Sequence, residues 1–294
     1  EKQIIRGEET ITYFNNSPDN LTYLWIQLDQ NVRARDSDSK KVQTNSISEK
    51  MDIAQLKKLH NDFDGGFKLD DVKDINGKDL PYVVNKTMMR VDLPKPLNPK
   101  SSVSLKLKWW YNINDRMEIG GRSGYEYFEE EDNYIYTIAQ FFPRMAVYNE
   151  VEGWQNKQFL GAGEFTLPFG DYKVNITVPA DHIVGATGVL QNTSTVLSSE
   201  QQSRFKKAKT AAEPVLIVTE DEARKAEKSK STEKKTWTYK AENVRDFGFA
   251  SSRKFIWDAV GVDFALIPIE ATFGRSTPMN EETVFHLTLE KPPG

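Results

Sequence analysis

The chain has 294 residues, of which 39 are basic and 43 acidic, so its formal charge is −4. This length gives room for one large domain or two smaller ones, each with a buried core. The near-neutral charge argues against a nucleic-acid-binding protein, which usually carries a basic face. The sequence contains no cysteine, which excludes disulfides, thiolate zinc clusters, iron–sulfur sites and cysteine nucleophiles.

The start of the chain has neither an initiator Met nor a charged-then-apolar signal region. We therefore expect either that a targeting segment was removed or that the chain begins inside a longer protein. No run approaches the roughly 18 consecutive apolar residues that a membrane-spanning helix needs. We accordingly expect no transmembrane segment.

Short extended segments separated by turns dominate the first hundred residues. Residues 10–14 are predicted to form a strand, and residues 21–28, which are apolar on both faces, a well-buried one. Asn76-Gly77 favours a hairpin turn, because both positions tolerate a positive φ. Residues 87–93 form the next predicted strand, which the prolines at positions 94, 96 and 99 are expected to end.

Residues 103–111 carry the clearest period of two, with apolar side chains from Val103 to Trp109 alternating with polar ones. This alternation is typical of a half-buried strand. Further extended segments and a few short helices complete the pattern: strands at 133–139, 172–178, 215–218, 235–239 and 247–251, and helices at 45–59, 199–212 and 220–230. The sequence therefore predicts an all-β, mainly antiparallel fold, either a β-sandwich or a large open sheet.

Motifs for metal or nucleophilic catalysis are missing. The three histidines, His60, His182 and His286, lie far apart, and no His-x-x-x-His pair occurs. Zinc catalysis usually needs two such histidines with a glutamate base, and a Ser-His-Asp triad needs a histidine base. We expect His60 and His182 to be surface or turn residues.

Three other features have ordinary structural interpretations. Gly161-Ala162-Gly163 lacks the third glycine of a dinucleotide loop, which favours a bulge or tight turn. The acidic residues from Glu126 to Asp132 lack the spacing of a calcium loop and are interpreted as a solvated acidic loop. Tryptophans at strand spacing favour a core role over a sugar-binding platform.

Residues 135–148 read Ile-Tyr-Thr-Ile-Ala-Gln-Phe-Phe-Pro-Arg-Met-Ala-Val-Tyr, and Gly153-Trp154-Gln155 follow shortly after. This stretch resembles the N-terminal domain of aminopeptidase N-type zinc metallopeptidases, the gluzincin aminopeptidase family, and in particular its Bacteroidetes branch. Supporting stretches extend the resemblance over roughly residues 4–258: 11–19, 24–31, 163–188 and 237–258.

The resemblance implies a saddle-shaped β-sandwich domain, residues 1–258, beside a thermolysin-like catalytic domain. In the family, the His-Glu-x-x-His zinc motif and the Gly-x-Met-Glu-Asn motif lie in that second domain, and neither occurs in this chain. The resemblance thus implies no cofactor here and a zinc ion in the missing catalytic domain. It also implies a periplasmic or exported protein. Residues 259–294 depart from the family and form a divergent C-terminal segment.

The resemblance also names two candidate substrate-binding residues. The family carries a Gln-aromatic-Glu-Pro stretch that directs a Gln or Glu to the free amine of the substrate. Gln140 corresponds to that Gln, whereas Phe142 replaces the acidic residue. Gln140 is therefore expected either to bind a peptide N-terminus or to be a buried strand residue bonded to backbone. Arg144 is expected to orient Gln140 or to pair with a carboxylate such as Glu150 or Asp246.

The main functional hypothesis is a non-catalytic N-terminal domain of an aminopeptidase-like zinc metallopeptidase. Its expected partners are the catalytic domain and a peptide N-terminus, and not nucleic acid. The alternative is a stand-alone exported β-sandwich that binds peptide or glycan, which an exposed Trp109-Trp110 pair at a sheet edge would favour. A large apolar face without a ligand-sized pocket would favour the first hypothesis. An independent hydrolase would need two carboxylates facing each other in a cleft.

Overall fold

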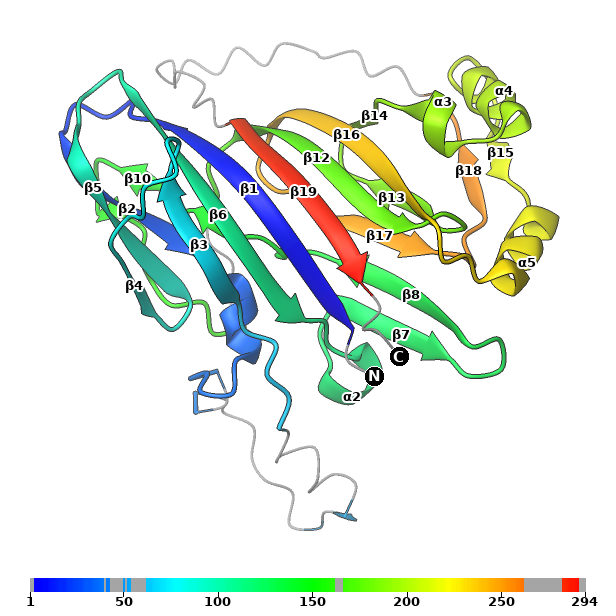
Figure 1. The fold of residues 1–294 in the computed structure, drawn as a ribbon, viewed down its shortest axis with the longest axis horizontal. Coiled ribbons are helices and arrows are strands. Elements are labelled where there is room, and N and C mark those ends of the chain that lie inside the picture. The colour runs from blue at the N-terminus through cyan, green and yellow to red at the C-terminus, as the bar shows by residue number, and fades with distance from the viewer. Residues whose placement is uncertain are drawn as a thin grey trace.

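The computed structural model describes residues 3–39, 41–42, 50, 52–53, 62–161, 166–261 and 282–290. The chain is mostly antiparallel β, with 45% strand and 14% helix, as the sequence predicted. A curved seven-stranded sheet forms one layer, and smaller sheets lie behind it (Figure 1). Most of the helix predicted at 45–59 and the Ala162-Gly163 part of the glycine-rich stretch lie outside the described residues.

The large sheet has the order β14-β16-β12-β19-β1-β6-β3. Its β12–β19 pair is parallel, and its other neighbouring strands pair antiparallel. Residues 282–290 form β19 in the middle of this sheet, so part of the C-terminal segment belongs to it. The strands are β1 (Ile4–Phe14), β3 (Lys68–Asp74), β6 (Ser102–Asn112), β12 (Gly170–Pro179), β14 (Val189–Leu190), β16 (Lys234–Val244) and β19 (Glu282–Glu290).

Two four-stranded sheets have the orders β13-β17-β8-β7 and β4-β5-β2-β9. Two short ribbons, β10–β11 and β15–β18, complete the β-structure of the described residues. These strands are β2 (Leu21–Gln27), β4 (Tyr82–Asn85), β5 (Met88–Leu97), β7 (Gly124–Phe128), β8 (Asn133–Ile138), β9 (Arg144–Met145), β10 (Tyr148–Asn149), β11 (Gly153–Trp154), β13 (Ile183–Ala186), β15 (Val215–Val218), β17 (Phe249–Ser252) and β18 (Trp257–Ala259).

The core lies between the large sheet and the smaller ones. On β6, the predicted alternation buries Leu105, Leu107 and Trp109, while Lys108 between them is exposed. Phe141, which follows β8, bridges the layers: its ring centroid lies 6.4 Å from that of Trp109 and 5.3 Å from that of Phe249 on β17. Burying each such side chain stabilises the fold by about 1.5–3 kcal/mol.

The prediction that strand 87–93 ends at its prolines is wrong, because β5 continues through Pro94 and Pro96 to Leu97. The pairing of β2 with β5 shifts register between Tyr23–Asp92 and Leu21–Leu97. The prolines therefore lie in an irregular stretch, where no regular ladder hydrogen bond requires their missing N–H. Both prolines are exposed.

The Asn76-Gly77 turn forms as predicted: Asp74 N–H donates to the Lys78 carbonyl at 2.8 Å. Gly77 takes the positive φ, of 85°. The helices α4 (Ser199–Ala208) and α5 (Glu220–Ser229) also form, each starting at a capping box, whereas η1 (Asp29–Arg33), α2 (Arg116–Ile119) and α3 (Thr193–Val196) are single turns. In the parts that the structure describes, no helix has the length and apolar character to cross a membrane.

Candidate functional site

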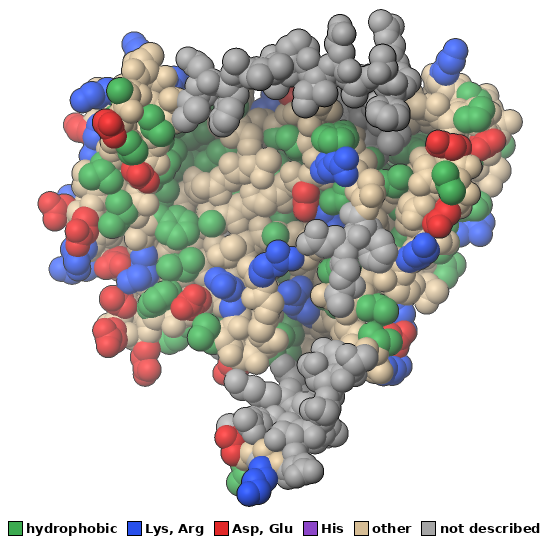
Figure 2. Space-filling view, turned by 180° about the vertical axis from the view of Figure 1, so that it is seen from behind, with side chains coloured by type: hydrophobic (Ala, Val, Ile, Leu, Met, Phe, Trp, Pro, Cys, Tyr) green, Lys and Arg blue, Asp and Glu red, His purple; other side chains and the backbone are tan. Residues whose placement is uncertain are grey.

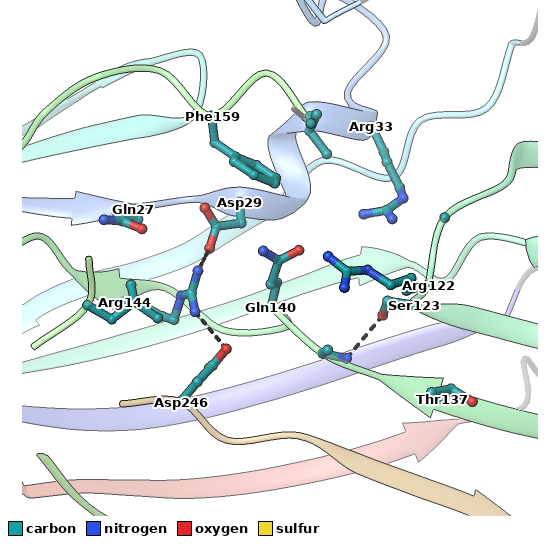
Figure 3. Close-up of a pocket in the computed structure, with 15 residues that line it drawn as sticks. Gln27, Asp29, Arg33, Arg122, Ser123, Thr137, Gln140, Arg144, Phe159 and Asp246 are labelled. Atoms are coloured by element: carbon teal, nitrogen blue, oxygen red, sulfur yellow. Dashed lines mark hydrogen bonds and ion pairs between the residues drawn. The ribbon is translucent and has the colours of Figure 1, made fainter. Parts of the chain in front are cut away.

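A cavity of about 640 Å³ lies where η1, the end of β8 and β9 approach one another. Its charged and amide side chains come from segments far apart in the sequence (Figure 3). Both sequence-predicted site residues line it, together with residues that the sequence did not point to. The groups on which the chemistry depends are Asp29, Arg33, Arg122, Gln140, Arg144 and Asp246.

Arg144 is held at this cavity by the short pairing of β9 with β2. Its side chain is only 7% exposed, and its two ends bind two carboxylates (Figure 3). Nη2 donates to Asp29 Oδ2, and Nη1 lies 2.8 Å from Asp246 Oδ2. The predicted pairing with Asp246 is confirmed, in place of the alternative Glu150. Asp29 was not predicted.

The two carboxylates fix the charge state of Arg144. Burial opposes the charge of the guanidinium, but attraction to Asp29 and Asp246 outweighs burial and raises the pKa of Arg144. Burial raises the pKa of Asp29, and Arg144 offsets part of that rise. A buried ion that loses its partner is strongly destabilising. The three groups therefore form a fixed wall of the cavity.

Gln140 lies just beyond β8 with a φ of 52°, in the left-handed region. Its carbonyl accepts a hydrogen bond from Gln30 Nε2 at 2.9 Å, and Ser123 Oγ accepts one from the preceding Ala139 N–H at 3.1 Å. Its half-buried side chain points into the cavity (Figure 3) and has no hydrogen bond within the described residues. The alternative prediction, a buried strand residue whose side chain bonds to backbone, is wrong.

The lining carries a small positive excess: three guanidinium groups, of Arg33, Arg122 and Arg144, face two carboxylates. Burial lowers the pKa of Arg33, whose Nη1 donates to Gln30 Oε1. Both carboxylates already bind Arg144, and Gln140 Oε1 is an acceptor at this wall that has no hydrogen-bond partner among the described residues. The arrangement is suited to binding and orienting polar groups.

The histidine predictions have mixed outcomes. His182 follows a turn, with its N–H donating to the Pro179 carbonyl, but it is 2% exposed, so the surface expectation is wrong. Its burial follows from its place at the start of β13, where Nδ1 lies 2.8 Å from Ser251 Oγ on β17. His60 lies outside the described residues, and the structure does not describe the side chain of His286 on β19.

The predicted solvated acidic loop is confirmed for the residues after β7, whereas the prediction is wrong for Glu126, which is half-buried on β7 itself. Glu129 to Asp132 are exposed, and two of them form ion pairs, Glu131 with Lys254 and Asp132 with Lys230. Among the residues that can be described, no group of three or more His, Asp or Glu side chains is arranged to hold a metal ion.

Of the two features that would separate the functional hypotheses, the exposed tryptophan pair at a sheet edge is not present among the described residues, and a large apolar face is not seen on the side that Figure 2 shows. Trp109 is 1% exposed and Trp110 half-buried, and β6 lies between β1 and β3 rather than at a sheet edge. The face in Figure 2 intersperses hydrophobic side chains with charged ones, without one large apolar area. The structure does contain a ligand-sized cavity, so the pocket-free apolar face that would have favoured the first hypothesis is not observed in the described residues.

No protein-family model and no curated protein matches the chain. Similar solved structures include the M1 zinc metallopeptidase of Deinococcus radiodurans, at 13% identity and a TM-score of 0.40, covering 85% of this chain and 38% of that one. A mutant of that metallopeptidase bound to a Tyr-Ser-Ala substrate matches at 12% identity and a TM-score of 0.40, covering 92% and 47%. This chain thus spans less than half the length of these metallopeptidases.

Proposed function

We propose that this chain is a non-catalytic N-terminal domain of an aminopeptidase-like zinc metallopeptidase, which packs on a catalytic domain and helps to bind the N-terminus of a peptide. The observation that carries the proposal is the uncommitted amide of Gln140 inside the 640 Å³ cavity. The sequence resemblance of residues 135–148 supports the family. In this proposal the catalytic domain would hold the zinc ion and would supply the hydrolytic chemistry.

Gln140 has the chemistry to receive an ammonium group. Its amide oxygen has free acceptor capacity, and a hydrogen bond from a charged donor is stronger than one between neutral groups. The positive φ and the bond from Gln30 hold its backbone in a single orientation. Asp246, whose side chain is 38% exposed, adds negative charge from the same wall.

In this proposal, the guanidinium groups determine the orientation of the bound peptide in the cavity. Figure 3 shows Arg33 and Arg122 on one side of Gln140, and Arg144 with its carboxylates on the other. The peptide ammonium therefore lies on the carboxylate side, and its carbonyl oxygens face Arg33 and Arg122. The parent protein is periplasmic or exported in this proposal, as the sequence resemblance implies.

The test is a titration of the purified chain with trialanine amide and with its N-acetylated form, followed by NMR. We expect the free amine to bind about tenfold more tightly, because acetylation removes a charged hydrogen bond. Gln140→Ala is expected to abolish the difference, whereas Gln191→Ala, an exposed glutamine beyond β14, leaves it intact. Equal binding of both peptides to the unaltered chain would contradict the proposal.

The ligand-sized cavity also favours a second candidate, a stand-alone module that binds peptide or glycan. Such a module recognises groups other than the free amine. It predicts equal affinity for the two peptides, or saturable binding of an oligosaccharide that Gln140→Ala does not weaken. The same titration therefore separates the two candidates.

A further inference from the structure

A second cavity, of about 560 Å³, lies between the sheets where β8 and β17 approach the ends of β1 and β12. It shares no lining residue with the first cavity. Its apolar walls include two tyrosines of β8, and its polar groups come from four other segments. The side chains on which the inference depends are Gln3, Tyr134, Tyr136, His182, Lys234 and Arg253.

Arg253, just after β17, is anchored at one of its nitrogens. Its Nε donates to Asp181 Oδ2 at 2.8 Å, and both side chains are largely buried, at 15% and 7% exposure. The same oxygen also accepts hydrogen bonds from Ser229 Oγ and from the Ser231 N–H. These contacts fix the guanidinium plane through Nε.

The two terminal nitrogens of Arg253 have no hydrogen-bond partner among the described residues. A guanidinium presents such nitrogens as paired parallel donors, which match the two oxygens of a carboxylate. Because Asp181 holds the Nε edge, the donors at the other end are oriented before any ligand arrives. An anchored but incompletely paired guanidinium is thus a preformed receptor for a carboxylate.

His182 contributes a neutral, buried imidazole beside Arg253. Burial lowers its pKa to about 3, with a further lowering by the charge of Arg253. Its Nδ1 bonds to Ser251, whereas its Nε2 is buried without a partner in the part of the chain that the structure describes. A buried polar atom without a partner costs free energy. His182 Nε2 is therefore available to form a hydrogen bond with a ligand in this cavity.

The tyrosines form an aromatic surface next to these polar groups. The rings of Tyr134 and Tyr136 are stacked, with centroids 6.1 Å apart, and Tyr136 lies 6.2 Å from the His182 ring. Tyr136 donates its hydroxyl hydrogen to Gln3 Oε1 at 2.9 Å, which fixes its ring. This surface suits the flat apolar body of a ligand.

The rim of the cavity is positively charged. Lys230 and Lys234 lie at the rim with one acidic side chain, Asp132, which pairs with Lys230. Lys234 is exposed and has no ion pair with another described residue. An unpaired lysine at a cavity mouth attracts anions, with a strength that falls as salt rises.

We propose that this second cavity binds a small aromatic carboxylate, with the carboxylate on Arg253 and the ring against Tyr134 and Tyr136. Lys234 adds attraction at the mouth, and His182 Nε2 remains for a polar substituent. The inference concerns a site separate from Gln140 and does not depend on the proposed function. Its failure would leave the N-terminal-domain proposal untouched.

The test compares phenylacetate with phenylacetamide, which has the same shape but no charge, by calorimetric titration of the full chain. We expect saturable binding of phenylacetate at one site and affinity at least about tenfold weaker for the amide, since hydrogen bonds to charged groups are the stronger ones. In NMR spectra, the imidazole signals of His182 should shift on saturation. No saturable binding of phenylacetate, or equal binding of the two compounds, would overturn the proposal.

Two variants locate the carboxylate. Arg253→Lys keeps a charge but loses the paired donors, and it should weaken phenylacetate binding about tenfold. Lys234→Gln should weaken it about two- to fivefold, as expected for an exposed charge, while the matched control Lys78→Gln in the β3 turn should change nothing. If the Arg253→Lys variant fails to fold, the proposal is tested by the Lys234→Gln variant and by the comparison of phenylacetate with phenylacetamide. An equal effect of Lys78→Gln would contradict the site.

Discussion

Arg144 and Asp246 form a 2.8 Å ion pair that joins β9 to the segment before β17. Asp29 of η1 binds the same guanidinium from the other side, so three segments far apart in the sequence meet at one buried charge. This junction forms the wall of the first cavity beside Gln140. Asp29 is buried and Asp246 is partly exposed, so the contributions of the two ion pairs to stability can be measured separately.

Removing Arg144 should cost far more stability than neutralising Asp246. Arg144→Met leaves Asp29, which is 2% exposed, as an unpaired buried charge, and we expect a loss of about 3–5 kcal/mol. Asp246→Asn removes a partner that is 38% exposed, which should cost no more than about 1 kcal/mol. Urea unfolding of both variants measures the difference. Similar losses would mean that Asp29 is not a buried partner of Arg144.

A second buried acid, Glu9 of β1, predicts an unusual pH dependence. It is 1% exposed, and burial raises its pKa well above the usual value. Neither carboxylate oxygen forms a full hydrogen bond within the described residues, although the Trp109 indole lowers the pKa in part. The folded state therefore favours the protonated form of Glu9.

A raised folded pKa means that this group destabilises the fold as pH rises above its unfolded value of 4.5. Glu9→Gln removes the titration, so the variant should exceed the unaltered chain in free energy of unfolding at pH 7–8. The gap should close below about pH 4, where the unfolded chain is protonated as well. Glu8→Gln, on the exposed face of the same strand, is the control. A gap that widens toward acid pH would contradict the assignment.

We predict that the stability of the fold requires a glycine at position 7, because the Trp109 ring lies close to its backbone. A Cβ at this position would lie 2.2 Å from the indole ring. Gly7→Ala should therefore cost at least about 1–3 kcal/mol, the usual range for overpacking. Gly185→Ala, in a strand where a Cβ meets nothing within 4 Å, should leave stability unchanged or slightly raised. Thermal unfolding compares the two, and equal Tm values would refute the close approach.

His182 should not titrate near neutral pH. Its pKa is lowered to about 3, compared with 6.5 for the free side chain, so its imidazole signals should stay constant from pH 8 to pH 5. A lowered folded pKa also means that its contribution to stability is lost as pH falls from 6.5 toward 3. NMR titration measures the first effect directly. A midpoint near 6.5 would show that His182 is solvated.

The strands were largely predictable because alternate side chains of a half-buried strand face the core. Apolar residues therefore recur at every second position of the sequence. The alternation of apolar and polar residues around Leu105 and Trp109 identifies β6. Asn76-Gly77 identifies the turn that follows β3. The continuation of β5 past Pro94 was not predictable, because it depends on a register shift against β2. The apolar–polar alternation of a strand indicates which of its side chains are buried. The pairing register of the strand depends in addition on the partner strand.

The site was predictable only in part for a similar reason. Gln140 and Arg144 lie in the stretch that carries the family resemblance, and Asp246 was among the carboxylates considered for Arg144. Asp29 is 115 residues from Arg144 and belongs to no motif, so only the fold brings the two together. The burial of His182 likewise arises from Ser251, 69 residues away.

The central claim is that Gln140 receives the ammonium of a peptide, and replacing it with glutamate tests this most directly. Gln140→Glu places a carboxylate at the same position, so trialanine amide should bind more tightly than to the unaltered chain, while Gln140→Ala should bind it more weakly. The N-acetylated peptide should not distinguish the three proteins. Unchanged affinity across the three proteins, or an equal change for the acetylated peptide, would contradict the account.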